Sequence, residues 1–247
     1  MAGHSKWKNI RIRKGKQDAI RGKIFTKVSR EIIVAAKSGG GDPDLNPRLR
    51  LAISKAKESS VPAENIKRSI QRGTGEIEGA AYEELVYEGK GPGGAGIMLE
   101  CYTENKNRTV SEVRHAFTKH GGSLGENGSV SWQFKRVGQM IFERAALDED
   151  EFTLAAIDAG ADDVESDAES FTVYCPMEAL HTTNSALEKA GFTASEVALI
   201  YKPSNMVELS NEDALKLLTL LDALEDVDDV QESYVNVEIP EELMQDS

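Results

Sequence analysis

The chain has 247 residues, of which 40% are hydrophobic and 29% are charged, and its formal net charge is −13. This composition is typical of a soluble globular protein with buried cores, and the length allows one large domain or two to three small ones. Only two cysteines occur, which excludes a disulfide framework, and no apolar run approaches the length of a membrane span or a secretory leader. We therefore expect a cytoplasmic protein that neither spans nor binds a membrane.

The charge is distributed unevenly along the chain. Residues 1–72 contain 18 Lys and Arg against 6 Asp and Glu, a net charge of +12, whereas residues 73–247 contain 11 against 36, a net charge of −25. The first 30 residues alone hold ten basic side chains and one acidic side chain, Asp18. Such a basic segment favours a polyanion as partner. A mitochondrial transit peptide is the weaker alternative, because the basic run continues into a predicted helix.

The N-terminal segment is predicted to be an arm followed by a helix. Residues 2–16 lack an apolar period, which indicates an extended arm. A helix is predicted over residues 18–37, where apolar residues recur on one side at a helical period. Lys23, Lys27 and Arg30 fall on the opposite side and lack interleaved glutamates as salt-bridge partners. An ordinary solvated face is the alternative, but the missing counter-charge favours a stripe that faces phosphates.

Two more short helices are predicted before the linker at residues 73–80. Asn46 and Pro47 form a typical helix start, with Asn as the cap and Pro in the first turn. Pro62 opens a third helix that is expected to end at Gly73. Three short helices in this stretch predict a small helical domain.

The remainder of the chain alternates predicted strands and helices. Strands are expected at residues 84–88, 97–102, 129–134, 137–142, 163–166, 170–174, 194–201 and 227–235, and helices at residues 109–119, 149–159, 176–190 and 211–224. The order β-α-β-β-α-β after residue 136 is that of a ferredoxin-like domain. The last α-β unit is too small to fold alone, so we expect it to return to the layer that begins near residue 82.

The predicted fold class is therefore α+β, with an N-terminal three-helix domain followed by two ferredoxin-like α+β domains. The predicted domains are residues 1–79, residues 80–135 together with residues 204–247, and residues 136–203. The middle domain is thus discontinuous, and the third is inserted into it.

The sequence shows no catalytic constellation. Residues 89–94 match the letters of the GxGxxG dinucleotide fingerprint, but Pro92 lies inside the motif and a predicted strand follows, so we interpret it as a hairpin turn. His115 and His120 are five residues apart and do not share a helix face as a zinc pair would. We therefore predict no enzyme, no metal and no cofactor.

The candidate nucleic-acid contacts are basic residues of the arm and of the first two helices. They are Lys6, Lys8, Arg11, Arg13, Lys14, Lys16, Arg21, Lys23, Lys27, Arg30, Arg48 and Arg50. A secondary anion contact is predicted at a helix start inside the acidic region, with Thr109 as the capping residue. Its residues are Asn107, Arg108, Thr109 and Arg114. Simple helix capping is an equally good interpretation of that cluster.

Motifs along the whole chain resemble the YebC/PmpR family. They are residues 1–7 (MAGHSKW), 21–27 (RGKIFTK), 39–43 (GGGDP), 46–50 (NPRLR), 87–94 (YEGKGPGG), 107–109 (NRT), 114–115 (RH) and 128–130 (GSV). The opening heptad and the glycine-proline hairpin are the most specific of these. The resemblance implies three domains, the middle one discontinuous, and a cytoplasmic, non-enzymatic regulator of gene expression.

The resemblance implies two kinds of nucleic-acid partner. Some family members are described as DNA-binding transcriptional regulators, and others, including mitochondrial relatives, as translation factors that bind ribosomal RNA and relieve stalling at proline runs. The residues themselves leave DNA, RNA and the ribosome open, because a helix that offers mainly lysine suits phosphates rather than base edges. An adaptor for a membrane surface or an acidic protein is an alternative of a different class, and an enzyme is a third and weaker one.

Overall fold

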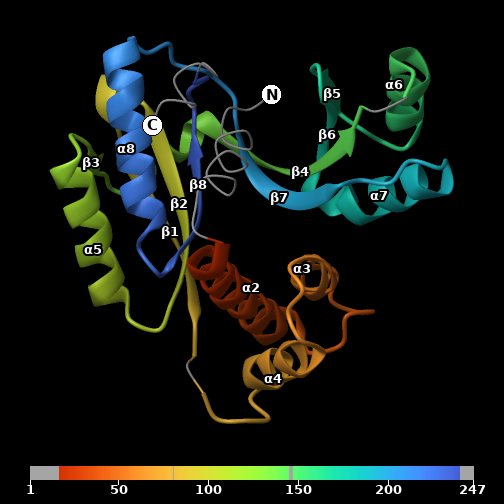
Figure 1. Cartoon of the computed structure of the whole chain (residues 1–247), viewed down its shortest axis with the longest axis horizontal. Coiled ribbons are helices and arrows are strands. Elements are labelled where there is room, and N and C mark those ends of the chain that lie inside the picture. The colour runs from red at the N-terminus through yellow and green to blue at the C-terminus, as the bar shows by residue number, and fades with distance from the viewer. Residues whose placement is uncertain (1–16, 80, 145–146, 240–247) are drawn as a thin grey trace.

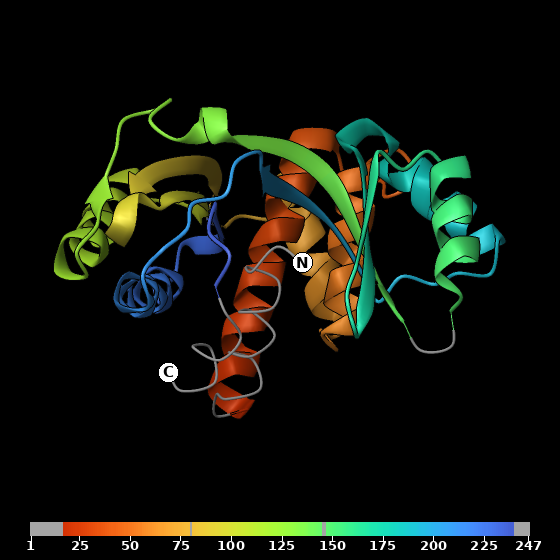
Figure 2. The same ribbon diagram turned by 90° about the horizontal axis from the view of Figure 1, so that it is seen from above.

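The computed structural model describes residues 17–79, 81–144 and 147–239, with side chains in the first helix from Gly22 onward. Its described strands form two separate four-stranded antiparallel sheets, and a group of three helices lies between the two α+β halves (Figures 1 and 2). The α+β fold class predicted from the sequence is confirmed.

The helical part consists of α2 (Gln17–Gly39), α3 (Pro47–Glu58) and α4 (Ala63–Thr74). Asn46 caps α3 as predicted, because its side chain accepts a hydrogen bond from the backbone N–H of Leu49 at 3.1 Å. The Asn46 side-chain amide also donates to the carbonyls of Ala35 and Gly40, at 2.9 and 2.8 Å. One buried side chain thus joins the end of α2 to the start of α3.

The first sheet has the strand order β3-β1-β2-β8 and carries two helices on one face. Its elements are β1 (Glu83–Lys90), β2 (Gly96–Thr103), α5 (Lys106–Lys119), β3 (Ser123–Leu124), α8 (Asn211–Glu225) and β8 (Val230–Val235). The C-terminal α-β unit therefore returns to this sheet, as expected. The GxGxxG segment lies in the β1–β2 hairpin, where a short 3-10 turn (Pro92–Gly94) follows β1, so its interpretation as a turn is confirmed.

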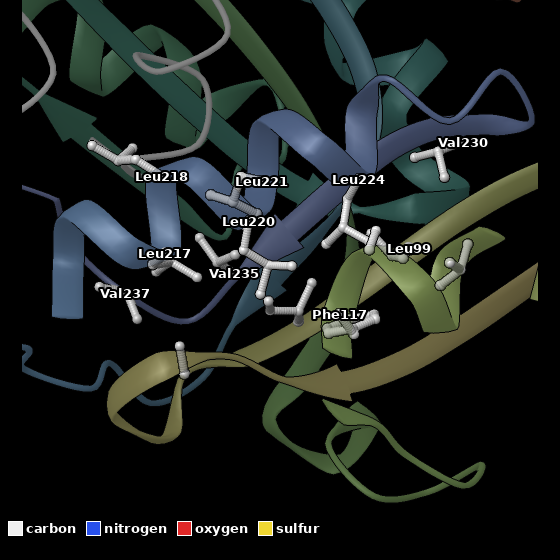
Figure 3. Close-up of a cluster of buried hydrophobic side chains, with 14 of the residues drawn as sticks. Leu99, Phe117, Leu217, Leu218, Leu220, Leu221, Leu224, Val230, Val235 and Val237 are labelled. Atoms are coloured by element: carbon white, nitrogen blue, oxygen red, sulfur yellow. The ribbon is translucent and has the colours of Figure 1, made fainter. Parts of the chain in front are cut away.

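The core of the first sheet lies between the strands and α8 (Figure 3). Every residue of β2 is buried, and leucines recur along α8 at helical spacing, so that Leu217, Leu220 and Leu224 face the sheet. Position 89 requires glycine, because a Cβ atom there would collide with the ring of Phe117 on α5. This packing fixes the position of the turn that joins α8 to β8.

The second sheet has the order β5-β6-β4-β7, with two helices on one face. Its elements are β4 (Phe134–Glu143), α6 (Glu149–Asp158), β5 (Asp163–Ser166), β6 (Ser170–Pro176), a 3-10 turn (Met177–Ala179), α7 (Leu180–Lys189) and β7 (Glu196–Pro203). This chain order and strand order are those of a ferredoxin-like domain, as predicted. The four strands of the first sheet are arranged in space as those of the second sheet are. Their chain order differs, because β1, which occupies the position of β6, is the first strand of its sheet in the sequence.

One predicted strand is wrong, and another begins later than predicted. Residues 129–134 were expected to form a strand, but Ser131–Gln133 form a 3-10 turn, η2, and β4 begins at Phe134. The physical reason is that backbone N–H groups of this segment bind the carboxylate of Glu88 instead of a neighbouring strand. The last strand begins at Val230 rather than at residue 227, because residues 226–229 form a turn after α8.

The face of the first sheet that its helices leave uncovered packs against the ends of β4 and β7. Met98 and Tyr234 from the first sheet meet Val130 and Phe134 in this apolar cluster. No helix in the described residues is long and apolar enough to cross a membrane.

Candidate nucleic-acid interface

The predicted arm contacts lie outside the described residues. These are Lys6, Lys8, Arg11, Arg13, Lys14 and Lys16. Arg21 belongs to α2, but its side chain is likewise outside the described part. The remaining predicted contacts can be placed.

The basic stripe of α2 faces another part of the same chain. Lys23 Nζ lies 2.9 Å from Asp226 Oδ1, and Lys27 Nζ donates to the backbone carbonyl of Gln231 at 3.1 Å. Asp226 belongs to the α8–β8 connection of the first sheet, at residues 226–229, and Gln231 is the second residue of β8. The side chains share one helix face, as the sequence predicted, but that face meets acidic and carbonyl groups more than 200 residues further along the chain.

Arg30, the third member of the stripe, is held at the same connection. It donates to the backbone carbonyl of Asp228, lies 3.4 Å from the carboxylate of Asp229, and covers the ring of Tyr82 at 5.3 Å. Since its side chain is largely buried, Arg30 serves the contact between α2 and the first sheet.

Asp229 is the centre of a buried polar cluster. Its carboxylate is fully buried and accepts hydrogen bonds from the hydroxyls of Thr103 and Thr109, at 3.0 and 2.8 Å, and from the Arg108 guanidinium at 2.8 Å. Burial alone would raise the pKa of this carboxyl, but the bonds from Arg108 and the two threonines outweigh it and lower the pKa. Asp229 is therefore an ionised anchor for Arg30 as well as Arg108.

The secondary anion contact is assembled differently from the prediction. The cap of α5 is Asn105, which accepts from the backbone N–H of Arg108 at 3.1 Å, so the expected capping role of Thr109 is wrong. The helix starts one turn earlier than predicted, which leaves Thr109 buried against Asp229. Asn107 and Arg114 are exposed.

Arg48 and Arg50 connect the helical part to the two sheets. Arg48 pairs with Glu84 of β1 at 2.7 Å and donates to the hydroxyl of Tyr102 at 2.9 Å. Arg50 lies 2.7 Å from His181 Nε2 on α7 and donates to carbonyls in the loop before α3. Both side chains are thus engaged within the chain.

A charge cluster at this junction contains the carboxyl group of Glu100, whose pKa is raised. Arg136 of β4 lies 3.3 Å from Glu100 on β2, and Glu84 stands between Arg136 and Arg48. Burial, together with the neighbouring Glu84 carboxylate, raises the pKa of Glu100 to about 7 despite the opposing charge of Arg136. The cluster therefore joins α3, the first sheet and the second sheet through a group that titrates near neutrality.

We expect the free energy of unfolding of the Glu100→Gln variant to rise relative to that of the parent protein as the pH increases from 5 to 8. Folded Glu100 keeps its proton up to about pH 7, whereas unfolded glutamate loses it near pH ~4.3, so parent stability falls with pH across this window. Urea unfolding at several pH values should show the difference growing by roughly 1 to 3 kcal/mol. The exposed Glu143→Gln variant is the control, and parallel profiles for all three proteins would contradict the assignment.

Free positive charge remains on the outer surface of α3 and α4. Four exposed side chains there have no carboxylate partner among the described residues: Lys57, Lys67, Arg68 and Arg72. On α4 they lie opposite Ile66 and Ser69, the buried residues of that helix. Lys67, Arg68 and Arg72 were not among the predicted contacts, although their positions opposite the apolar residues of the third predicted helix were a usable signal.

The described residues show little that suits catalysis. They contain no group of three or more His, Cys, Asp and Glu side chains that could hold a metal ion. Both cysteines are buried, and burial raises the pKa of the Cys101 thiol, which keeps it protonated and unreactive.

Two family models together match most of the chain. The model described as TACO1/YebC protein N-terminal domain matches residues 5–76, and that described as TACO1/YebC second and third domain matches residues 82–237. The chain belongs to the TACO1/YebC family. The gap between the two matches falls in the connection between α4 and β1, and the family resemblance seen in the sequence is confirmed.

Other TACO1/YebC proteins are similar to this chain over nearly its full length. A probable transcriptional regulatory protein of Persephonella marina is 53% identical over 99% of both chains. One of Thiobacillus denitrificans is 54% identical over 98% of this chain and all of its own. The crystal structure of the conserved hypothetical protein Aq1575 from Aquifex aeolicus is 46% identical and superposes with a TM-score of 0.84, covering 91% of this chain and 93% of that chain.

Proposed function

We propose that this TACO1/YebC protein is a cytoplasmic, non-enzymatic regulator of gene expression that binds nucleic acid through its helical domain. In this proposal residues 1–79 form the binding domain, while residues 80–135 with 204–247, and residues 136–203, form two acidic α+β domains. The names of the relatives from Persephonella marina and Thiobacillus denitrificans support a role in transcription.

The observation that carries the proposal is the unpaired positive charge of α3 and α4. A chain with a net charge of −13 keeps four exposed cations on this surface without acidic partners among the described residues. Surface cations that are not engaged within the protein are available to neutralise phosphates and to release their counterions. The net negative charge of the α+β domains disfavours the same ligand over most of their surface, so the helical domain offers its main electrostatic contact.

The stripe on α2 has a supporting role in this account. Lys23, Lys27 and Arg30 hold the helical domain against the α8–β8 connection and the start of β8. The arm residues Lys6 to Lys16 precede α2 and add further phosphate contacts.

The ligand is DNA in the leading version of the proposal. The alternative is ribosomal RNA, bound by a ribosome-associated translation factor that relieves stalling at proline runs. It is favoured by Lys57 and Lys67, two of the four free cations, because lysine suits phosphates and shape rather than base edges.

Photocrosslinking in cells tests the proposal and separates its two versions. The chain is crosslinked, purified under denaturing conditions, and both its bound DNA and its bound RNA are sequenced. Enrichment of promoter DNA supports the transcriptional version, and enrichment of large-subunit ribosomal RNA supports the translational one. Recovery of neither nucleic acid above the level of an uncrosslinked control would refute nucleic-acid binding.

A further inference from the structure

Trp132 is exposed on the surface of the molecule. Its side chain is 70% accessible, although tryptophan normally buries most of its large ring. It belongs to η2, the single 3-10 turn that leads into β4 and is drawn in green at the upper rim of Figure 2. This position is on the opposite side of the molecule from the N-terminal end of α2.

The backbone beneath Trp132 is fixed by a buried carboxylate. Glu88 on β1 accepts hydrogen bonds from the backbone N–H groups of Gly128, Val130 and Ser131, each at 2.8 Å. Burial alone would raise the pKa of Glu88, but these three donors outweigh it and lower the pKa, so the carboxylate stays ionised. The loop before Trp132 is therefore held by a charged group that strands of this kind rarely bury.

The residues on both sides of Trp132 are anchored as well. Val130 and Phe134 are buried in the apolar cluster between the two sheets. Between them, Gln133 accepts a bond from the backbone N–H of Ser204 at 2.7 Å, and its side chain bonds Asn236. The indole is thus presented to solvent from a rigid support, which lowers the entropic cost of binding a planar partner.

The surroundings of Trp132 are polar and carry free positive charge. Lys135, three residues further along, is exposed and has no ion-pair partner among the described residues. The same holds for Lys90, which lies opposite Ser123 at the start of the loop that Glu88 holds. Glu126 is an exposed acidic residue in the same loop.

The exposed Trp132 ring and the exposed lysines Lys90 and Lys135 favour one class of partner over another. A protein interface requires a contiguous apolar patch. Trp132 is the only exposed large apolar side chain within residues 121–135, and the segment that bonds Gln133 through Ser204 adds one more, Met206. A single exposed indole with adjacent cations suits a planar base with neighbouring phosphates. A base inside a duplex is stacked on its neighbours and cannot reach the ring, so the base must be unpaired.

We propose that Trp132 is a stacking platform for an unpaired nucleobase, with Lys90 and Lys135 contacting the adjacent phosphates. This inference deepens the proposed function and rests on it, because it names single-stranded or looped nucleic acid as the ligand class at a second surface.

The fluorescence of Trp132 provides a direct test. The chain has two tryptophans, so the Trp7→Phe variant emits from Trp132 alone. Short oligouridine, a duplex DNA of equal length and inorganic polyphosphate are titrated into this variant, and binding is followed in parallel by competition against a labelled oligouridine. We expect oligouridine to quench the emission in step with binding, and polyphosphate to bind without quenching.

Substitutions then separate stacking from charge. In the Trp7→Phe background, Trp132→Ala should weaken oligouridine binding by roughly 5- to 100-fold and Trp132→Phe by less, since stacking contributes about 1–3 kcal/mol per base. Polyphosphate affinity, measured on the same preparations, reports whether each variant is folded. Lys135→Gln should reduce the salt slope for oligouridine by about 0.7.

Three results would overturn the inference. Oligouridine that binds without changing the emission would show that Trp132 does not contact the bases. Emission that depends on protein concentration alone would show that a second copy covers the ring. If none of the three probes binds, the proposed function itself is rejected. This outcome differs from the first one because the labelled oligouridine then shows no binding for which another probe could compete.

Discussion

Replacement of both Lys67 and Arg68 by glutamine is expected to weaken nucleic-acid binding by roughly 10- to 100-fold near physiological salt. Both side chains are exposed on α4 and have no acidic partner among the described residues, so their charge is available to phosphates. Each lost phosphate contact lowers the slope of log affinity against log salt by about 0.9 for duplex DNA and about 0.7 for a single strand. Fluorescence anisotropy at a series of salt concentrations measures both quantities.

A charge-matched control separates the α4 surface from net charge. Lys119 and Lys189 are exposed in the last turns of α5 and α7, and neither has an ion pair among the described residues. Their double replacement by glutamine removes the same total charge, and we expect only a small loss of affinity. Equal losses for both double variants would show that overall charge, rather than the α3–α4 surface, governs binding.

The Asp229→Asn variant is expected to lose about 2 to 4 kcal/mol of unfolding free energy at neutral pH. The carboxylate is fully buried, pairs with Arg30 and Arg108, and accepts bonds from two threonines. The asparagine amide has the same shape but no negative charge, so Arg30 and Arg108 lose their ionic partner. Urea unfolding followed by circular dichroism measures the loss.

The pH dependence of this loss is a second part of the same prediction. The folded pKa of Asp229 is lowered, so its contribution is complete above the unfolded value near ~3.9 and is lost as the pH falls through the folded pKa. The gap between parent and variant should therefore close in acid. The exposed Asp226→Asn variant should cost less than about 1 kcal/mol at any pH. If the urea unfolding midpoint of the Asp229→Asn variant equals that of the parent, the buried cluster contributes nothing to the stability of the fold.

Local patterns sufficed for most of the fold. The Asn46-Pro47 pair predicts the start of α3, and the β-α-β-β-α-β order predicts the second sheet from the sequence alone. The expectation that the last α-β unit returns to the first sheet followed from its small size, and β8 does pair with β2. These features depend on residues close together in sequence or on simple limits of domain size.

The main failures involve a partner distant in sequence. Lys23 and Arg30 lack local counter-charges, and the sequence could not show that Asp226 and Asp229 supply them across the fold. The alternation in residues 129–134 suits a strand, but Glu88 takes the backbone N–H groups that a strand would need. Availability for binding is likewise a tertiary property. The helical pattern could have placed Lys67 and Arg68 on the outer face, but the structure was needed to show that they have no acidic partner among the described residues.

The most direct measurement of the central claim is a peptide map of the crosslinks formed with nucleic acid in cells. After nuclease and protease digestion, mass spectrometry identifies the peptides that carry nucleotide adducts. If the helical domain is the binding part, the adducts concentrate in residues 1–79, including peptides of α3 and α4, with a separate adduct at Trp132. Adducts confined to the two acidic α+β domains, with none in the helical domain, would contradict the account.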